Sequence, residues 1–381
     1  MINLTINTRL ICWALLSLAS AVVLTACGSS SSNSSNNNED DDLATMEELG
    51  RQLYFDTNLS NPVGQSCASC HTPEVGFDDP DDLLATSEGA VLDRFGSRNS
   101  PTASYAAFAP PLRFDVEENR FVGGLFWDGR ADSLEEQARM PFLNPLEMNM
   151  ESEAAVVEAV RQSEYAQDFI DVFGEDAFED VEEAFINISE AIAEFERTSE
   201  FSPFTSKFDA VQAELAEFTP SEQRGFELFI GELDEGGADC VGCHNSFEDG
   251  PVLFSSFEYD NLGVPANPNN PFYSIAQDLN PAGESFIDLG LGAVVNDDRE
   301  DGKFRTPPLR NIAETAPYMH NGVFSSLQEV LAFYNDRDPN DAEVTRNITD
   351  DESVGNLNFN QQQLDDLEAF LRTLSDGYSV E

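Results

Sequence analysis

The stretch CASCH at residues 67–71 decides the fold, and CVGCH at residues 240–244 repeats its pattern in the second half of the chain. Each stretch contains two cysteines separated by two residues and followed directly by a histidine. This spacing is the attachment pattern of c-type haem. Two thiols at this spacing can reach the two vinyl groups of one porphyrin, and the adjacent imidazole can bind its iron. The predicted haem-binding residues are Cys67, Cys70, His71, Cys240, Cys243 and His244.

Two other interpretations of the cysteine motifs stay open, a structural zinc site and a redox-active cysteine pair. The halves of a four-ligand zinc site usually lie about 12–20 residues apart, far less than the separation of these two motifs. A redox-active pair has no need of a histidine after both motifs. Haem is therefore the favoured interpretation, with His71 on the first iron and His244 on the second.

Histidine is scarce in this chain, which limits how the two irons can be ligated. Only three histidines are present, and two of them belong to the cysteine motifs. The third, His320, can serve one haem. The other haem then has methionine, tyrosine, water or an open position in sixth place. An open position would admit peroxide or another small ligand.

The amino terminus has the pattern of a secretory signal, because an apolar run too short to span a bilayer comfortably follows a single cation. The run ends in LTACG at residues 24–28, which resembles the lipobox of bacterial lipoproteins. We therefore predict a signal peptide at residues 1–26, a lipid anchor at Cys27 and a flexible acidic tether at residues 27–42. Ordinary cleavage without lipid stays open as the alternative.

Charge excludes one large class of function. The 381 residues include 72 Asp and Glu against 19 Lys and Arg, for a formal net charge of −53. Nucleic-acid binding is not expected, since phosphate recognition needs clustered cations. Because 41% of the residues are hydrophobic and 29 are Phe, packed cores are expected beneath this acidic surface. The acidity suits a salty environment, or it steers a basic partner, and both explanations can hold.

Helix signals dominate the body of the chain, and strand alternation is scarce. Capping boxes predict helix starts at Thr45, Ser133, Thr219 and Ser326. Helical spacing of apolar residues predicts two core-facing stripes. These stripes are Val181, Phe185, Ile188, Ile192 and Phe195, and Leu364, Leu367, Leu371 and Leu374. We predict an all-α fold, mainly helical and rich in loops, with a long loop at residues 263–281.

Seven motifs in a fixed order resemble those of one known family, the bacterial di-haem cytochrome c peroxidases with the related MauG-type enzymes. The resemblance covers residues 50–374. The motifs are CASCH (67–71), SRNSPT (97–102), FWDGR (126–130), NPLEM (144–148), CVGCH (240–244), FRTPPLRN (304–311) and APYMHNG (316–322). The resemblance implies two cytochrome c-like haem domains, a peroxidatic one at residues 43–202 and an electron-transfer one at residues 203–381.

The resemblance also assigns roles to individual residues. It places Trp127 between the haems, Glu147 beside the bound peroxide as a proton shuttle, and Gln137 in the same distal pocket. A buried carboxylate suits this task, since burial raises its pKa. A calcium ion between the haems would be bound by Asn99, Thr315 and Pro317, whose oxygen atoms suit a hard cation.

The chain departs from the peroxidase pattern at three places. No histidine lies between His71 and His244, so the first haem is expected to be five-coordinate or water-bound and to need no prior half-reduction. Tyr334 stands where the peroxidases have methionine, as in MauG-type enzymes, and a tyrosine ligand favours ferric iron. Tyr334 also continues an apolar helical stripe, so a core role stays open. Ala238 replaces the tryptophan through which MauG-type enzymes oxidise a protein substrate.

The sequence favours a di-haem peroxidase that reduces hydrogen peroxide to water at the amino-terminal haem. Electrons would come through the carboxy-terminal haem from a soluble donor such as a small cytochrome c or a cupredoxin. The alternatives are a MauG-like enzyme that oxidises a partner protein, and an electron-transfer lipoprotein without catalysis. We expect a location on the periplasmic side of a bacterial membrane, with the outer membrane favoured and contact through the lipid alone. Pairing with a second copy is also expected.

Overall fold

The structure, a computed structural model, describes residues 45–81, 83–245 and 251–380. All of them belong to one unit, which runs from Leu43 to Glu381. The predicted signal peptide, the lipid anchor at Cys27 and the tether all lie outside the described residues. Within the described part, no helix is long and apolar enough to cross a membrane.

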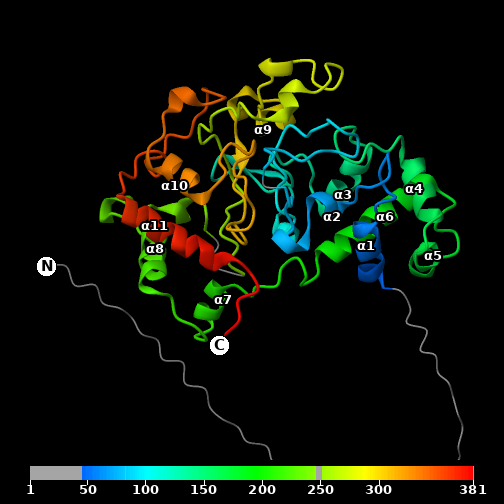
Figure 1. Ribbon diagram of the computed structural model, residues 1–381, viewed down its shortest axis with the longest axis horizontal. Helices are drawn as coiled ribbons and strands as arrows, with labels where there is room; N and C mark the ends of the chain where they lie inside the picture. The colour runs from blue at the N-terminus through cyan, green and yellow to red at the C-terminus, as the bar shows by residue number, and fades with distance from the viewer. Residues whose placement is uncertain (1–44, 82, 246–250, 381) are drawn as a thin grey trace, which may run out of the picture. The chain divides into compact units, whose positions relative to one another are not determined.

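The fold is mainly helical, as predicted, with short strands and many loops (Figure 1). The α-helices are α1 (Met46–Phe55), α2 (Cys67–Cys70), α3 (Leu134–Leu143), α4 (Glu153–Arg161), α5 (Ala166–Phe173), α6 (Val181–Glu196), α7 (Lys207–Gln212), α8 (Pro220–Ile230), α9 (Leu291–Val295), α10 (Leu327–Asn335) and α11 (Gln361–Leu371). The 3-10 helices are η1 (Pro73–Val75), η2 (Ala106–Phe108), η3 (Leu233–Glu235), η4 (Cys240–Gly242), η5 (Pro271–Ser274), η6 (Gly283–Ser285), η7 (Asp298–Glu300), η8 (Pro339–Asp341) and η9 (Arg372–Leu374).

Among the described residues, four short strands form two antiparallel pairs. Strand β1 (Arg113–Asp115) pairs with β2 (Arg120–Val122), with Phe114 opposite Phe121. Strand β3 (Tyr259–Asp260) pairs with β4 (Phe304–Arg305), with Tyr259 opposite Arg305. The second pair matters for function, because it joins the segment after the second cysteine motif to the FRTPPLRN motif.

The two halves of the described chain repeat one packing plan. In the first half α1 packs on α6, and in the second half α8 packs on α11 (Figure 1). Each contact is made at a glycine: a Cβ on Gly50 would lie 1.9 Å from the carbonyl oxygen of Ala191, and one on Gly225 would lie 1.9 Å from that of Asp366. Only glycine permits these helix backbones to come so close. In both halves a cysteine motif follows the first helix of the pair, at α2 and at η4.

Aromatic side chains fill both helix-pair cores. In the first half Tyr54 makes edge contacts with Phe195 and Phe201, at ring-centre distances of 5.5 and 5.4 Å. In the second half Phe370 contacts Phe226 and Phe229, at 5.3 and 5.2 Å. Each fully buried phenylalanine stabilises the fold by roughly 1.5–3 kcal/mol. Cys67 packs against the first of these cores and Cys240 against the second, so the cores support both cysteine motifs.

The four predicted helix starts are confirmed, with one difference in detail. Thr45, Ser133, Thr219 and Ser326 all cap helices, and their hydroxyls accept from the backbone N–H three residues later. Only at Thr219 does the glutamate side chain return to the cap residue itself. The Glu136 and Glu329 carboxylates accept instead from the N–H of Asp132 and Ser325, one residue before each cap.

The predicted stripe of α6 is correct except at its first position. Phe185, Ile188, Ile192 and Phe195 are buried, but Val181 is 39% exposed because it lies in the first helical turn, beyond the contact with α1. The predicted loop at residues 263–281 contains the short helix η5 and is otherwise irregular. The predicted domain boundary near residues 201–203 falls between α6 and α7, and it stays a prediction.

Candidate haem sites

The first cysteine motif places its histidine in a partly buried position. His71 follows α2, and its Nδ1 lies 3.3 Å from the carbonyl oxygen of Phe77 and 3.4 Å from Oγ of Ser100. Burial lowers the pKa of His71, although the contact with Phe77 opposes this shift. The imidazole is therefore neutral, and with Nδ1 engaged its Nε2 is the nitrogen suited to bind iron.

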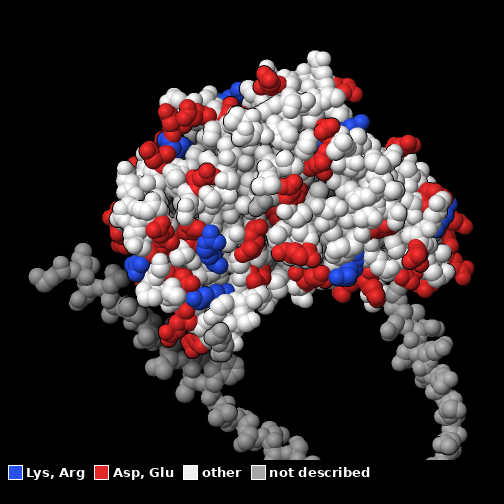
Figure 2. Space-filling model, viewed as in Figure 1, with Lys and Arg blue, Asp and Glu red and all other residues white. Residues whose placement is uncertain are grey.

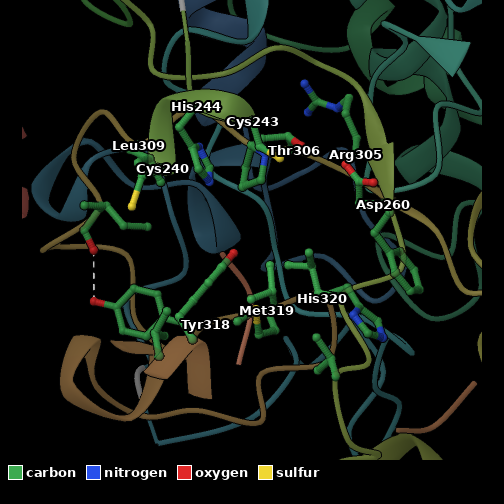
Figure 3. A pocket seen from close by; sticks show the side chains of 18 of the residues that line it. Cys240, Cys243, His244, Asp260, Arg305, Thr306, Leu309, Tyr318, Met319 and His320 are labelled. Atoms are coloured by element: carbon green, nitrogen blue, oxygen red, sulfur yellow. Dashed lines mark hydrogen bonds between the residues drawn. The ribbon is translucent and has the colours of Figure 1, made fainter. Parts of the chain in front are cut away.

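The second motif repeats this arrangement with a shorter contact. Nδ1 of His244 lies 2.8 Å from the carbonyl oxygen of Phe254. Burial again lowers the pKa of the histidine, and the contact with Phe254 opposes the shift. Figure 3 shows Cys240, Cys243 and His244 on one side of a cavity, across from Tyr318, Met319 and His320.

The cavity at the second motif fits a porphyrin. Its wall includes the apolar side chains of Leu309, Leu331 and Leu371, beside Cys240, Cys243 and His244. Burial raises the pKa of Cys240 and of Cys243 to about 12. Among the described residues, no three His, Cys, Asp or Glu side chains are grouped so that they could hold a metal ion. The donor set therefore suits covalent haem attachment better than zinc.

Tyr334 lines the same cavity as His244, on α10. Its ring makes an edge contact with Phe333 at a ring-centre distance of 5.8 Å. Burial raises the pKa of Tyr334 well above its usual value, so the phenol is protonated in the absence of a metal. A ligand role would therefore require a strong Lewis acid, such as ferric iron, to remove this proton.

Glu147 lies beside the first motif, where the sequence predicts the distal acid. It belongs to the turn after α3, and its Oε1 accepts from Nδ2 of Asn144 at 2.9 Å. Burial raises the pKa of Glu147, although Arg130 and Asn144 oppose the shift. The carboxylate also contributes to the raised pKa of Cys70, which places it near that thiol. Gln137, the other predicted distal residue, lies partly buried on α3.

The SRN segment connects the two sites. Ser100 contacts His71 of the first site, and the preceding residue, Asn99, accepts at its carbonyl oxygen from Nε1 of Trp127 at 2.9 Å. Trp127, Asn99 and Ser100 all line the cavity of the second site. The structure thus brings the predicted inter-haem tryptophan to the region between the two motifs.

Two of the three predicted calcium ligands meet in this region. The side-chain amide of Asn99 lies 2.6 Å from the carbonyl oxygen of Pro317, and both residues line the second cavity together with Thr315. The amide Nδ2 is the donor in this contact, so the Asn99 side chain is hydrogen-bonded to Pro317 here, and the calcium site stays a prediction.

A chain of buried charges runs alongside Trp127. Arg98 pairs with both oxygens of Asp288, at 2.6 and 2.8 Å, and with Asp128 at 2.6 Å, and Asp128 also pairs with Arg130. Burial raises the pKa of Asp288, but Arg98 outweighs it and the pKa falls to about 2. Arg98 and Asp288 belong to different halves, so this ion pair links the two haem sites. The sequence analysis did not single out Arg98 or Asp288.

His320 lies in the wall of the second cavity. Its ring stacks on Phe304 at a centre distance of 3.6 Å, and its Nε2 lies 3.7 Å from Oε2 of Glu343. Its backbone carbonyl accepts from the N–H of Asn99 at 2.8 Å. His320 is therefore part of the inter-site region, and its role as a haem ligand stays a prediction.

The sequence analysis also missed Phe77 and Phe254. Both carbonyls face an axial-type histidine, and both residues adopt a left-handed backbone with φ of 58°. A carbonyl carries no side-chain signal, and large aromatic residues rarely adopt positive φ. No residue-type pattern could therefore have pointed to them.

The comparisons with known proteins agree with this geometry. Residues 44–216 match the sequence model described as di-haem cytochrome c peroxidase. The chain is 39% identical to the methylamine utilization protein MauG of Paracoccus denitrificans, covering 86% of this chain and 88% of that protein. It is 31% identical to the cytochrome c551 peroxidase of Nitrosomonas europaea, covering 87% and 80%. The crystal structure of the di-haem peroxidase BthA from Burkholderia thailandensis superposes with a TM-score of 0.76 at 31% identity, covering 87% and 86%.

The fold and the two cysteine motifs together define a di-haem c-type oxidoreductase. The chain belongs to the di-haem cytochrome c peroxidase and MauG family, whose members carry two c-type haems. It is a peroxidase-type oxidoreductase.

Proposed function

We propose that this protein reduces hydrogen peroxide to water at the first haem site, with electrons entering at the second site from a small cytochrome c or a cupredoxin. The observation that carries the proposal is Glu147, a partly buried acid with a raised pKa beside the first motif. His244 and His320, the two histidines outside that motif, both line the second cavity. This arrangement supports a first site that is open to peroxide.

Glu147 would move the proton that peroxide cleavage requires. Hydrogen peroxide takes up two electrons and two protons to give two water molecules, and the O–O bond breaks heterolytically when a proton moves from the inner to the outer oxygen. Iron bound at His71 would supply the peroxide-binding centre and the route for electrons. The Glu147 carboxyl accepts the first proton and returns it, and the contact with Asn144 holds it in place.

Trp127 and its neighbours would position the two sites for electron transfer. The indole is fixed by the bond to Asn99, and the adjacent Asp128 is fixed by Arg98 and Arg130. Tyr334 and His244, which line the same cavity, would hold the second iron, and Asn99, Thr315 and Pro317 would hold calcium. The residues at each place carry the donor atoms these roles require.

A second candidate function, oxidation of a partner protein as in MauG, is favoured by Tyr334 and by the identity to the Paracoccus protein. Ala238 argues against it. This residue is buried and packs in a cluster with Phe229 and Phe254, whose rings are much harder to oxidise than tryptophan or tyrosine. The position therefore offers no side chain that could relay an oxidising equivalent to a docked protein.

We place the protein on the periplasmic side of a bacterial membrane, anchored through lipid on Cys27. A Cys27→Ser variant is then expected in the soluble periplasmic fraction, whereas the wild type is expected with the membranes. Equal membrane fractionation of both proteins would contradict the anchor.

The function is tested by steady-state peroxide reduction with a reduced cytochrome donor. We expect Glu147→Gln to lower kcat/KM for peroxide by at least about 100-fold, the usual contribution of a positioned proton-transfer group. Glu175→Gln, at an exposed glutamate, is the matched control and should behave as wild type. Unchanged turnover in Glu147→Gln would contradict the assignment.

A further inference from the structure

The two candidate haem sites differ in how firmly they hold the histidine. Nδ1 lies 3.3 Å from its carbonyl at His71 and 2.8 Å from its carbonyl at His244. The carbonyl of Phe77 also accepts from the N–H of Ala103 at 2.9 Å. Both acceptors belong to phenylalanines with φ of 58°, a strained conformation that needs support from its surroundings.

Arg310 supplies such support at the second site. Its side chain is 1% exposed, and its Nε donates to the carbonyl of Val252 at 2.8 Å, two residues before Phe254. Its guanidinium carbon lies 5.7 Å from the centre of the Phe254 ring. The neighbouring residue, Leu253, is also held by a backbone hydrogen bond, because its carbonyl accepts from the N–H of Leu309 at 3.3 Å.

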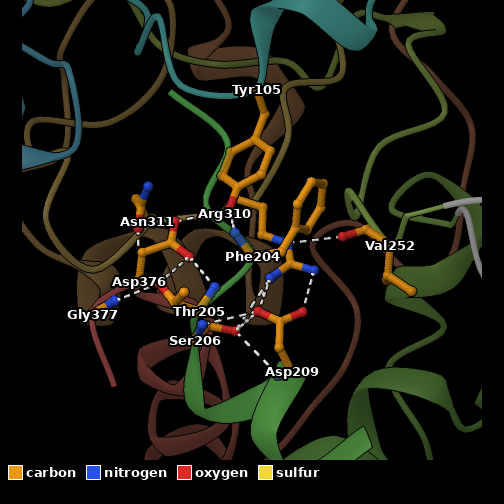
Figure 4. Close-up of polar contacts among 10 residues, drawn as sticks. All are labelled: Tyr105, Phe204, Thr205, Ser206, Asp209, Val252, Arg310, Asn311, Asp376 and Gly377. Atoms are coloured by element: carbon orange, nitrogen blue, oxygen red, sulfur yellow. Dashed lines mark hydrogen bonds and ion pairs between the residues drawn. The ribbon is translucent and has the colours of Figure 1, made fainter. Parts of the chain in front are cut away.

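Asp209 fixes the other side of the guanidinium (Figure 4). The two terminal nitrogens of Arg310 bind its carboxylate oxygens at 2.6 and 2.9 Å. That carboxylate also accepts from the N–H and hydroxyl of Ser206, at 2.9 and 2.6 Å. A planar guanidinium can bind a carboxylate with two parallel bonds and still donate from Nε, whereas a lysine ammonium cannot reproduce this geometry.

We propose that Arg310 is a positioning residue for His244. By fixing the segment that carries the carbonyl of Phe254, it keeps the hydrogen bond to Nδ1 short. A strong bond at Nδ1 makes the imidazole more anionic and favours ferric iron at Nε2. Arg310 thus lowers the midpoint potential of the second haem relative to the first. The proposal rests on His244 as the axial ligand, part of the proposed function.

The test is a spectroelectrochemical titration of both haems in the full-length holoprotein, in the absence of peroxide. Arg310→Lys keeps the charge beside Asp209 but loses the simultaneous bond to Val252. We expect the midpoint potential of the second haem to rise and that of the first to stay unchanged. Arg224→Lys is the matched control, because Arg224, on α8, also binds a carboxylate, that of Asp366, through two hydrogen bonds. It should move neither potential.

A second variant separates the effect of the lost hydrogen bonds of Arg310 from the effect of its charge. It also avoids leaving a buried charge without a partner, which could prevent folding. Arg310→Gln combined with Asp209→Asn removes both charges together, so any remaining shift comes from the lost positioning. An upward shift confined to the second haem supports the proposal. It is overturned if both variants bind two haems and leave the second potential at the wild-type value, or if both haems shift equally. Because no peroxide is used, the result does not depend on whether the protein is a peroxidase.

Discussion

Glu196 is a buried acid near the first haem site that the sequence did not reveal. It lies at the end of α6 and is 8% exposed. Burial raises its pKa to about 8, with Arg197 opposing and Glu135 reinforcing the shift. The charge of Glu196 in turn raises the pKa of Tyr54 and of Cys67, so it belongs to the surroundings of the first motif.

The raised pKa of Glu196 predicts a specific pH dependence of stability. In the unfolded chain this acid ionises near pH 4.5, whereas in the folded protein it stays protonated up to about pH 8. The free energy of unfolding should therefore fall as pH rises between these values and be unaffected by this group below them. Glu196→Gln should flatten the curve and gain on the order of 2–4 kcal/mol at pH 8. Denaturant titrations across this range check it, and parallel curves for both proteins would contradict the assignment.

Tyr334 determines the character of the second haem in our proposal. Tyr334→Phe removes the phenol oxygen but keeps the ring contact with Phe333. We expect the ferric second haem to change its optical and electron-spin spectra and its midpoint potential to rise, because a phenolate favours ferric iron. Identical ferric spectra in the variant and the wild type would show that Tyr334 is a core residue only.

At the level of elements, the fold rests on two glycine contacts between helices. Gly225→Ala in α8 would gain about 0.5–1 kcal/mol of helix propensity. The added methyl would lie 1.9 Å from the carbonyl oxygen of Asp366, so α8 and α11 must separate. The packing cost of at least about 2 kcal/mol should exceed the gain in helix propensity, so the free energy of unfolding should fall.

Gly96→Ala is the control for this prediction. Its added Cβ would meet a backbone oxygen only at 3.7 Å, an ordinary contact, and its backbone is not left-handed. Denaturant unfolding of both variants checks the difference. A Gly225→Ala protein as stable as Gly96→Ala would show that the two helices can shift at little cost.

Local signals predicted the elements well, and contacts distant in sequence account for what they missed. The caps at Ser133 and Thr219 and the stripe of α6 are encoded within a few residues, so they could be read directly. The pairing of Gly225 with Asp366 could not, because it joins two helices at opposite ends of the second half. The same holds for Val181, whose exposure depends on how far α1 extends along α6.

The candidate sites show the same division. The cysteine motifs and Glu147 carry their own sequence patterns. Arg98 meets Asp288 across 190 residues, and Arg310 meets Asp209 across 101. Arg98–Asp288 joins the two halves and Arg310–Asp209 joins distant segments of the second half, so both pairs become visible only in the folded chain.

At the scale of the whole molecule, charge is the dominant feature. Figure 2 shows acidic side chains spread over the visible face, with few lysines and arginines among them. With a net charge of −53, like charges repel across the folded surface. Salt screens this repulsion over a Debye length of about 10 Å at 0.1 M and about 3 Å at 1 M.

Salt should therefore stabilise the protein and slow its encounter with a basic donor. We expect the unfolding temperature to rise as sodium chloride increases to 1 M, and the second-order rate with a basic cytochrome c to fall steeply over the same range. An acidic cupredoxin provides the comparison, since its rate should rise or stay level. If the second-order rate with the basic donor does not change with salt concentration, the acidic surface does not steer this partner.

The central claim is an open first haem that reacts with peroxide. The most direct test adds stoichiometric hydrogen peroxide to the fully ferric protein and follows the optical and electron-spin spectra. We predict loss of a high-spin ferric signal without any prior reduction, since the two histidines outside the first motif lie at the second site. No spectral change until one haem has been reduced would contradict the account and indicate a first site that is closed at rest.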